Sequence, residues 1–313
     1  MYYFFTLLLL SLELCGAPFP IQFGIPENRI VKEIPEKTQD FAYVTPYDRN
    51  TYIFEKEADY YQDYQRSYYA VTCKKAGWDA LRHYEILANG TIPYFTDLAQ
   101  APADSMIFLP RELILEAMHL EGVSHGHIDH EKFDKKRYFE ILEQLLEHTR
   151  AHLTTKKMAQ YVLDSIGYKG SGNILFISGC LWPDYMRCLL LTGFKDLYQE
   201  RIVDYPKVHH VYKSYPEAAI LGLYGKGMSY TRTVEDLPVD RENIEERIKK
   251  REFDLIVYGS IHRGNGFLDL VKEHYLPEEI VYICGEDIHG CQHLHNHNLF
   301  LREFDWNREL ITK

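Results

Sequence analysis

The chain lacks an apolar run long enough to span a bilayer. A membrane-crossing helix needs about 20 predominantly apolar residues. The run MYYFFTLLLLSL at residues 1–12 is shorter than that, and no later stretch reaches this length. We therefore predict no stable transmembrane anchor.

Positive charge is also scarce. Lysine and arginine together number 35, against 46 aspartates and glutamates, which gives a formal net charge of -11. Proteins that bind nucleic acid along an extended surface usually have a basic face. We therefore expect no nucleic-acid partner, and a local cluster of cations would have to hold any anionic ligand.

Cysteines are few and scattered. The six are Cys15, Cys73, Cys180, Cys188, Cys284 and Cys291, and none forms a C-x-x-C pair. This spacing does not indicate a disulfide-rich scaffold. We predict that most of them are buried thiols.

Two common nucleotide-binding motifs are absent. The sequence contains neither G-x-G-x-x-G nor the P-loop pattern G-x-x-x-x-G-K-[ST]. GLYGKG at 222–227 is rich in glycine but has neither spacing, so we interpret it as a turn. A standard dinucleotide site or P-loop is therefore not supported.

The composition is that of a globular protein. The 313 residues are 46% hydrophobic and 26% charged, which is enough for two domains of common size. Residues 1–17 have the apolar core of a signal peptide, with small residues at 15–17 for cleavage. The alternative is a hydrophobic N-terminal strand. A secretory and a cytoplasmic location therefore both stay open.

The first predicted domain covers residues 18–168 and ends in helices. Short apolar runs between proline and aspartate turns predict strands at 41–44, 51–54, 68–73 and 91–95. Amphipathic spacing predicts helices at 57–69, 110–120, 136–153 and 156–166. The glycine-rich segment GYKGSGN at 167–173 is the predicted boundary.

The second predicted domain covers residues 173–305. Continuous apolar runs at 173–180, 253–260 and 279–286 are typical of strands buried on both faces of a parallel sheet. Helical patterns at 241–251 and 266–275 lie between them. This alternation predicts βαβ units and a Rossmann-like α/β domain.

A candidate ligand site lies between the strands 68–73 and 91–95. Lys74 and Lys75 follow the first strand, and Arg82 and Glu85 lie on the next helix. Loops at the carboxyl ends of parallel strands are where α/β proteins bind ligands. The cations suit a diphosphate and the carboxylate suits a ribose diol, so we predict a nucleotide-sugar pocket. The alternative is a surface ion pair between Arg82 and Glu85.

The same stretch resembles a known family. Its residues fit the pattern R-x-Y-E-x-L-x-x-G-x-I-P of exostosin-like glycosyltransferases at Arg82, Tyr84, Glu85, Leu87, Gly90, Ile92 and Pro93. The resemblance implies a GT-B fold, in which two Rossmann-like domains face each other across a cleft and the motif contacts the donor nucleotide. The donor-binding residues would be Lys74, Lys75, Arg82, Glu85, Asn89 and Gly90.

The position of the motif differs from that in the family. In GT-B enzymes the motif lies in the second domain, whereas here it lies in the first. The segment at 298–306 could precede the segment at 18–26 as naturally as it follows the rest, which is the pattern of a circular permutation. The residues of the family's other domain therefore cannot be transferred to this chain.

Further candidates follow the strands of the second predicted domain. Glu286, Asp287 and His289 are candidates for the general base that deprotonates an acceptor hydroxyl. His262, Arg263 and Asp184 are candidates for the cleft, where an arginine would neutralise a leaving diphosphate.

Alternating histidines suggest a second kind of site. His293, His295 and His297 would share one face of a strand, and imidazoles in this arrangement can bind zinc, copper or nickel. The alternative is a solvated polar edge.

The sequence therefore predicts a glycosyltransferase that takes its sugar from a nucleotide-sugar donor. The acceptor would be a glycan, a lipid or a protein. The reaction requires no cofactor, although it is compatible with a divalent metal. Two alternatives remain: a metal-binding protein or metal-dependent hydrolase that uses the histidines at 289–297, and a non-catalytic nucleotide-sugar-binding module.

Overall fold

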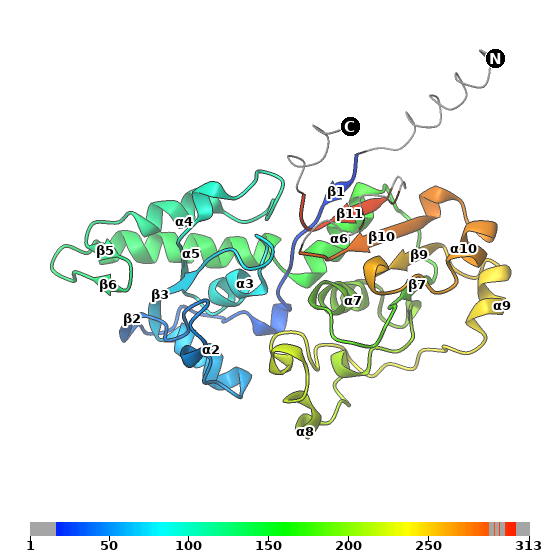
Figure 1. Cartoon of the computed structure of the whole chain (residues 1–313), viewed down its shortest axis with the longest axis horizontal. Helices are drawn as coiled ribbons and strands as arrows, with labels where there is room; N and C mark the ends of the chain where they lie inside the picture. Colours follow the sequence, from blue (N-terminus) through cyan, green and yellow to red (C-terminus); the bar gives the residue numbers. More distant parts are fainter. Residues whose placement is uncertain (1–16, 288–290, 292–293, 295–297, 305–313) are drawn as a thin grey trace, which may run out of the picture.

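The computed structural model describes residues 17–287, 291, 294 and 298–304 (Figure 1). The described chain is a mixed α/β structure with one large and one small parallel sheet. The two sheets lie in different halves of the molecule, and α5 (Lys135–His152) and α6 (Thr155–Ser165) follow the small sheet in the sequence.

The large sheet has six parallel strands in the order β1-β11-β10-β9-β7-β8. The strands are β1 (Phe19–Pro20), β7 (Ile174–Ile177), β8 (Ile202–Tyr205), β9 (Leu255–Tyr258), β10 (Ile280–Cys284) and β11 (Leu299–Leu301). Every residue of β7, β9 and β10 is buried, which explains their continuous apolar sequences. Strand β7 lies between β8 and β9, so the strand order reverses there, as in Rossmann-like sheets.

Helices cover both faces of this sheet. Ile174, Phe176 and Val257 point into one apolar core with α7 (Tyr185–Tyr198) and α6. Leu175 and Ile256 point into a second core with α9 (Ile244–Lys249) and α10 (Leu268–His274). This alternation confirms the α/β prediction for this half of the chain and is compatible with a Rossmann-like sheet.

The small sheet consists of three parallel strands, β2 (Gln39–Phe41), β3 (Ser67–Thr72) and β4 (Ile92–Phe95). The helices of this half are α2 (Glu57–Gln65), α3 (Leu81–Ala88), α4 (Arg111–Met118) and α5, with a short hairpin of β5 (Val123–Ser124) and β6 (His127–Ile128). Helix α3 connects β3 to β4 and carries the residues of the candidate site.

The two halves exchange chain segments. Strand β1 pairs with β11 in the large sheet, and the Ile21 N–H donates to the Leu301 carbonyl at 2.9 Å. Helix α6 packs against α7, so closely that a Cβ on Gly193 would lie 2.0 Å from the Thr155 carbonyl oxygen. The start and the end of the predicted segment 18–168 therefore both pack on the second half.

Two parts of the secondary-structure prediction were wrong. No strand forms at 51–54, where a 3-10 turn at Arg49–Thr51 leads into Tyr52 and Ile53, both exposed. The first strand of the small sheet lies at 39–41 instead of 41–44. Apolar residues alone do not form a strand where no neighbouring strand is available for backbone pairing.

Candidate functional site

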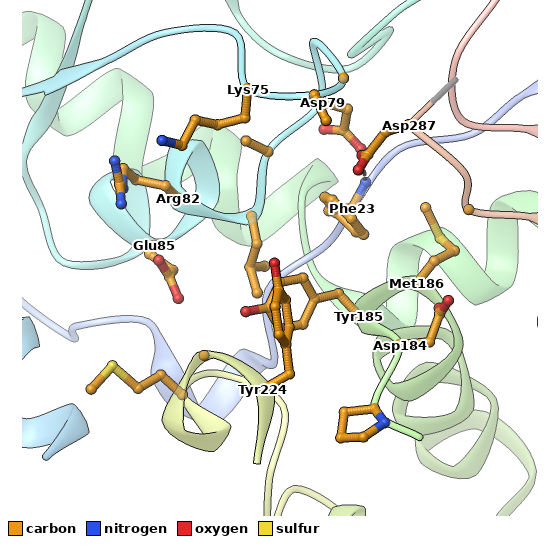
Figure 2. Close-up of a pocket in the computed structure, with 18 of the residues that line it drawn as sticks. Phe23, Lys75, Asp79, Arg82, Glu85, Asp184, Tyr185, Met186, Tyr224 and Asp287 are labelled. Carbon is orange, nitrogen blue, oxygen red and sulfur yellow. Dashed lines mark hydrogen bonds between the residues drawn. The ribbon is translucent and has the colours of Figure 1, made fainter. Parts of the chain in front are cut away.

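A cavity of about 790 Å³ lies between the two halves of the molecule (Figure 2). Its walls come from the start of α3, from the start of α7, and from the segments that follow β10 and β11. This volume is in the range of small-molecule sites. Residues at the N-terminal ends of both helices line the same space, and the helix dipole of α3 favours an anionic ligand there.

One wall carries two cations that have no carboxylate partner among the described residues. The Arg82 guanidinium lies 5.4 Å from the centre of the Tyr52 ring, and its Nε is buried without a hydrogen-bond partner. The Lys75 ammonium lies 3.3 Å from the Tyr52 hydroxyl and 3.8 Å from the centre of the Tyr47 ring. Burial alone would raise the pKa of Tyr52, but hydrogen bonds and charges from Arg82 and Lys75 lower it. The potential at this wall is therefore positive.

Glu85 lies one helical turn further along α3 and is almost completely buried. Its carboxylate accepts hydrogen bonds from the Tyr60 hydroxyl at 3.0 Å and from the Ser229 hydroxyl. Burial raises the pKa of Glu85, and these hydrogen bonds together with the charge of Arg82 oppose that shift. The alternative of a surface ion pair between Arg82 and Glu85 was wrong, since Glu85 is buried and bonded to hydroxyls.

Asp184 begins the opposite wall, at the N-cap of α7. It accepts a hydrogen bond from the Arg187 amide at 2.9 Å, and its Oδ2 lies 3.1 Å from His262 Nε2 and 3.4 Å from Arg263 Nε. Burial alone would raise the pKa of Asp184, but the hydrogen bonds from His262 and the Arg187 amide hold it well below its usual range. A stable negative charge therefore lies at this edge of the large sheet.

Arg302 connects this wall to α3 and was not anticipated from the sequence. Its fully buried guanidinium donates to the Asp79 carbonyl at 2.5 Å, to the Gly285 carbonyl at 3.0 Å and to the Asp287 carboxylate. The Asp79 side chain accepts from the Phe23 amide at 2.7 Å and the Tyr84 hydroxyl at 2.6 Å, and burial raises the pKa of Asp79 to about 6. Asp79 and Asp287 face each other in Figure 2.

The cavity brings together six of the predicted site residues. They are Lys75, Arg82 and Glu85 from the first half, and Asp184, Arg263 and Asp287 from the second.

Other predicted site residues lie elsewhere. Lys74 is exposed, its ammonium lies 5.0 Å from the centre of the Trp78 ring, and it is not among the residues that line the cavity. Asn89 is buried, and its amide bonds to Gln65 and to the Glu85 carbonyl. Gly90 follows the end of α3 with a φ of +63°, and a Cβ there would lie 2.9 Å from Pro35. A glycine is therefore needed for the turn after the helix.

His262 and Glu286 lie just behind the cavity wall. The Nε2 of His262 is 3.4 Å from Glu286 Oε1. His289, His293, His295 and His297 lie outside the described residues.

Aromatic residues complete the cavity. Tyr52, Tyr60, Trp182, Tyr185 and Tyr224 line it, together with Lys226. Tyr60 comes from the segment 57–69, which was predicted only as an amphipathic helix, and Tyr224 comes from GLYGKG at 222–227, which was interpreted as a turn. Their density in aromatic residues and glycine was the only sequence signal for this role.

The cysteine prediction needs one correction. Cys284 and Cys291 form a disulfide with their Cα atoms 6.3 Å apart, whereas Cys73 and Cys188 are buried thiols and Cys180 is an exposed thiol. Cys15 lies outside the described residues. The bridge spans only seven positions, and its second cysteine follows the end of β10.

Comparisons with known proteins identify no relative. The chain matches no protein-family model, no curated protein and no solved structure. Within the described residues, no helix has both the length and the apolar character needed to cross a membrane.

Proposed function

We propose that the protein is a glycosyltransferase that transfers a sugar from a nucleoside-diphosphate donor. The observation that carries this proposal is the Arg82 guanidinium, which has no carboxylate partner among the described residues and lines the cavity beside Lys75 and Glu85. A partly buried cation without a carboxylate costs free energy unless an anionic ligand compensates it. A diphosphate is a ligand of the required charge and shape.

The donor would lie across the start of α3. Arg82 and Lys75 would bind the diphosphate, and Glu85 would accept hydrogen bonds from the ribose hydroxyls in place of those from Tyr60 and Ser229. The aromatic side chains of Tyr52 and Tyr185 offer faces for a base.

The opposite wall would carry the chemistry. Asp287 would accept the proton of an acceptor hydroxyl as its oxygen attacks the anomeric carbon. The bond from this carbon to the diphosphate oxygen then breaks, and Arg263 together with Arg82 would stabilise the charge on the leaving diphosphate. Arg302 positions Asp287 through their hydrogen bond.

The resemblance of residues 82–93 to exostosin-like glycosyltransferases supports the same proposal. A GT-B arrangement places the donor site in a cleft between two parallel sheets, and the cavity has this location. The pairing of β1 with β11 supports a permuted order of the two halves, because the first and last described strands are adjacent.

The hydrogen bonds of Glu85 do not separate a transferase from a non-catalytic module. Both of its carboxylate oxygens accept from hydroxyl groups, and a ribose would have to displace these groups in either case. A module that binds nucleotide without transfer would retain affinity and show no turnover.

An assay of nucleotide release from sugar donors tests the proposal. Purified protein is incubated with UDP-, GDP- and ADP-sugars, and the free nucleoside diphosphate is quantified for wild type and for Asp287→Asn. We expect slow hydrolysis of one donor by wild type and a loss of at least tenfold in the variant. Nucleotide binding without release from any donor would support the non-catalytic module instead.

A further inference from the structure

We propose that His262, Cys284 and Cys291 form a thiol-dependent binding site for a zinc-like metal ion when the disulfide is reduced. A ring nitrogen of His262 and the two sulfurs all lie within 4.8 Å of one another. The three residues come from the ends of β9 and β10 and from the segment that follows, so the fold itself assembles them. This inference is independent of sugar transfer.

The chemistry of the three side chains fits such an ion. Two thiolates and one imidazole are the ligand types that zinc prefers in proteins. Cys284 and Cys291 are almost completely buried, and the side chain of His262 is 5% exposed. Two thiolates in this environment would be costly without a cation, whereas a bound divalent ion compensates their charge.

One ring nitrogen of His262 is held by carboxylates. Its Nε2 lies 3.1 Å from the Asp184 carboxylate and 3.4 Å from the Glu286 carboxylate. Its Nδ1 is buried and has no hydrogen-bond partner within the described part of the chain. A metal-binding histidine commonly donates its second N–H to a carboxylate, which fixes the ring and leaves the other nitrogen for the ion. Asp184 would fill that role here.

The disulfide makes the site redox-dependent. A dithiol reductant would transfer two electrons to the Cys284–Cys291 bond, giving two thiols and the cyclic disulfide of the reductant. Each thiol then loses one proton as it binds the ion. Three protein ligands leave a fourth position of a tetrahedral ion for water or a ligand.

The proposed site is defined without the alternating histidines of the sequence. His293, His295 and His297 lie outside the described residues, and histidine ligands need no reduction to bind metal. Binding that depends on reduction therefore separates the two sites.

The test uses the full chain in two redox states. Zinc-free protein is prepared with the disulfide intact or reduced by a dithiol that is then removed under anaerobic conditions. Zinc stoichiometry is measured by equilibrium dialysis, and cobalt(II) is used as a spectroscopic probe. We expect one additional zinc per chain after reduction, together with a thiolate-to-cobalt charge-transfer band in the near ultraviolet.

Three variants locate the ligands. Cys284→Ser and Cys291→Ser should each abolish binding of the additional zinc. The thiolate-to-cobalt charge-transfer band should also be lost in each variant. His262→Ala should weaken zinc binding by about 100-fold or more, since changes to groups that only orient a ligand already cost about 10- to 100-fold. Cys180→Ser is the matched control, because it removes an exposed thiol outside the cluster, and it should leave both signals unchanged.

Equal zinc binding in the two redox states of wild type would overturn the proposal without the need for any variant. A cobalt spectrum without a thiolate band would contradict it as well, because it would assign the ion to histidines alone.

Discussion

The Arg82 guanidinium lies 5.4 Å from the centre of the Tyr52 ring, and no carboxylate of the described residues pairs with it. Arg302, on the other side of the same cavity, pairs with the carboxylates of Asp287 and Glu303 and donates to two carbonyl groups. Two arginines in one cavity thus have opposite surroundings. This contrast suggests that Arg82 serves a ligand and Arg302 serves the fold.

The contrast predicts different effects on stability. Arg302→Met should lower the free energy of unfolding by about 3–5 kcal/mol, because it leaves buried acceptors and a carboxylate without a partner. Arg82→Met should change it by less than about 1 kcal/mol, since Arg82 has no ion pair with a described residue to lose. Urea unfolding followed by circular dichroism measures both. Equal losses would show that Arg82 has a structural partner.

The two loop lysines should differ in ligand binding. Lys75 lines the cavity, whereas the neighbouring Lys74 does not. Lys75→Ala should weaken binding of a nucleoside diphosphate about tenfold, the effect of losing one charge-assisted hydrogen bond. Lys74→Ala, which removes the same charge from the adjacent position, is the control and should bind like wild type. Fluorescence or calorimetric titration distinguishes the two outcomes, and equal losses would indicate only long-range attraction.

His83 should make stability depend on pH. The buried ring lies 2.9 Å from the Thr72 hydroxyl and 3.0 Å from the Trp78 carbonyl, and burial lowers the pKa of His83 to about 4. The unfolded chain binds this proton near pH 6.5, so the folded state loses stability as the pH falls from about 6.5 to 4. For one such group the loss is about 3 kcal/mol.

His83→Gln isolates this contribution. Burial also raises the pKa of Asp79 to about 6 and that of Glu303 to about 7, so those groups favour folding as the pH falls. Their effect is common to wild type and variant. The unfolding free energy of wild type should therefore fall by about 3 kcal/mol relative to that of the variant between pH 7 and pH 4. A constant difference would mean that His83 does not titrate in this range.

Gly193 should be required for the contact between α6 and α7. A methyl group there would lie 2.0 Å from the Thr155 carbonyl oxygen. Alanine would favour the helix by about 1 kcal/mol, but displacing a packed backbone costs about 1–3 kcal/mol. We expect Gly193→Ala to lower the melting temperature. Gly266→Ala, where nothing lies within 4 Å of the added carbon, is the control, and an equal change in both variants would contradict the packing argument.

The sequence predicts the three central strands of the large sheet best, whereas its outer strands β1, β8 and β11 were not predicted. Strands β7, β9 and β10 are buried on both faces, so their apolar residues are continuous and their positions follow directly. The segment 51–54 has similar residues but no strand beside it. Whether a neighbouring strand is present depends on the tertiary structure and not on the local sequence.

Some residues of the candidate site can be predicted from a local sequence pattern, and others cannot. Arg82 and Glu85 belong to one local pattern on α3, which can be recognised from spacing alone. Arg302 reaches Asp79 from a position 223 residues away, and no local pattern indicates that contact. The disulfide was missed for a related reason, since cysteine spacing does not determine which thiols meet.

The central claim is that Arg82 and Glu85 bind the nucleotide part of a sugar donor. Calorimetric titration of wild type, Arg82→Met and Glu85→Ala with UDP, GDP and ADP tests it most directly. We predict that wild type binds one nucleotide per chain with a preference for one base, and that each substitution weakens this binding at least tenfold. If none of the three nucleotides binds wild type, or if both variants bind as tightly as wild type, the claim is contradicted.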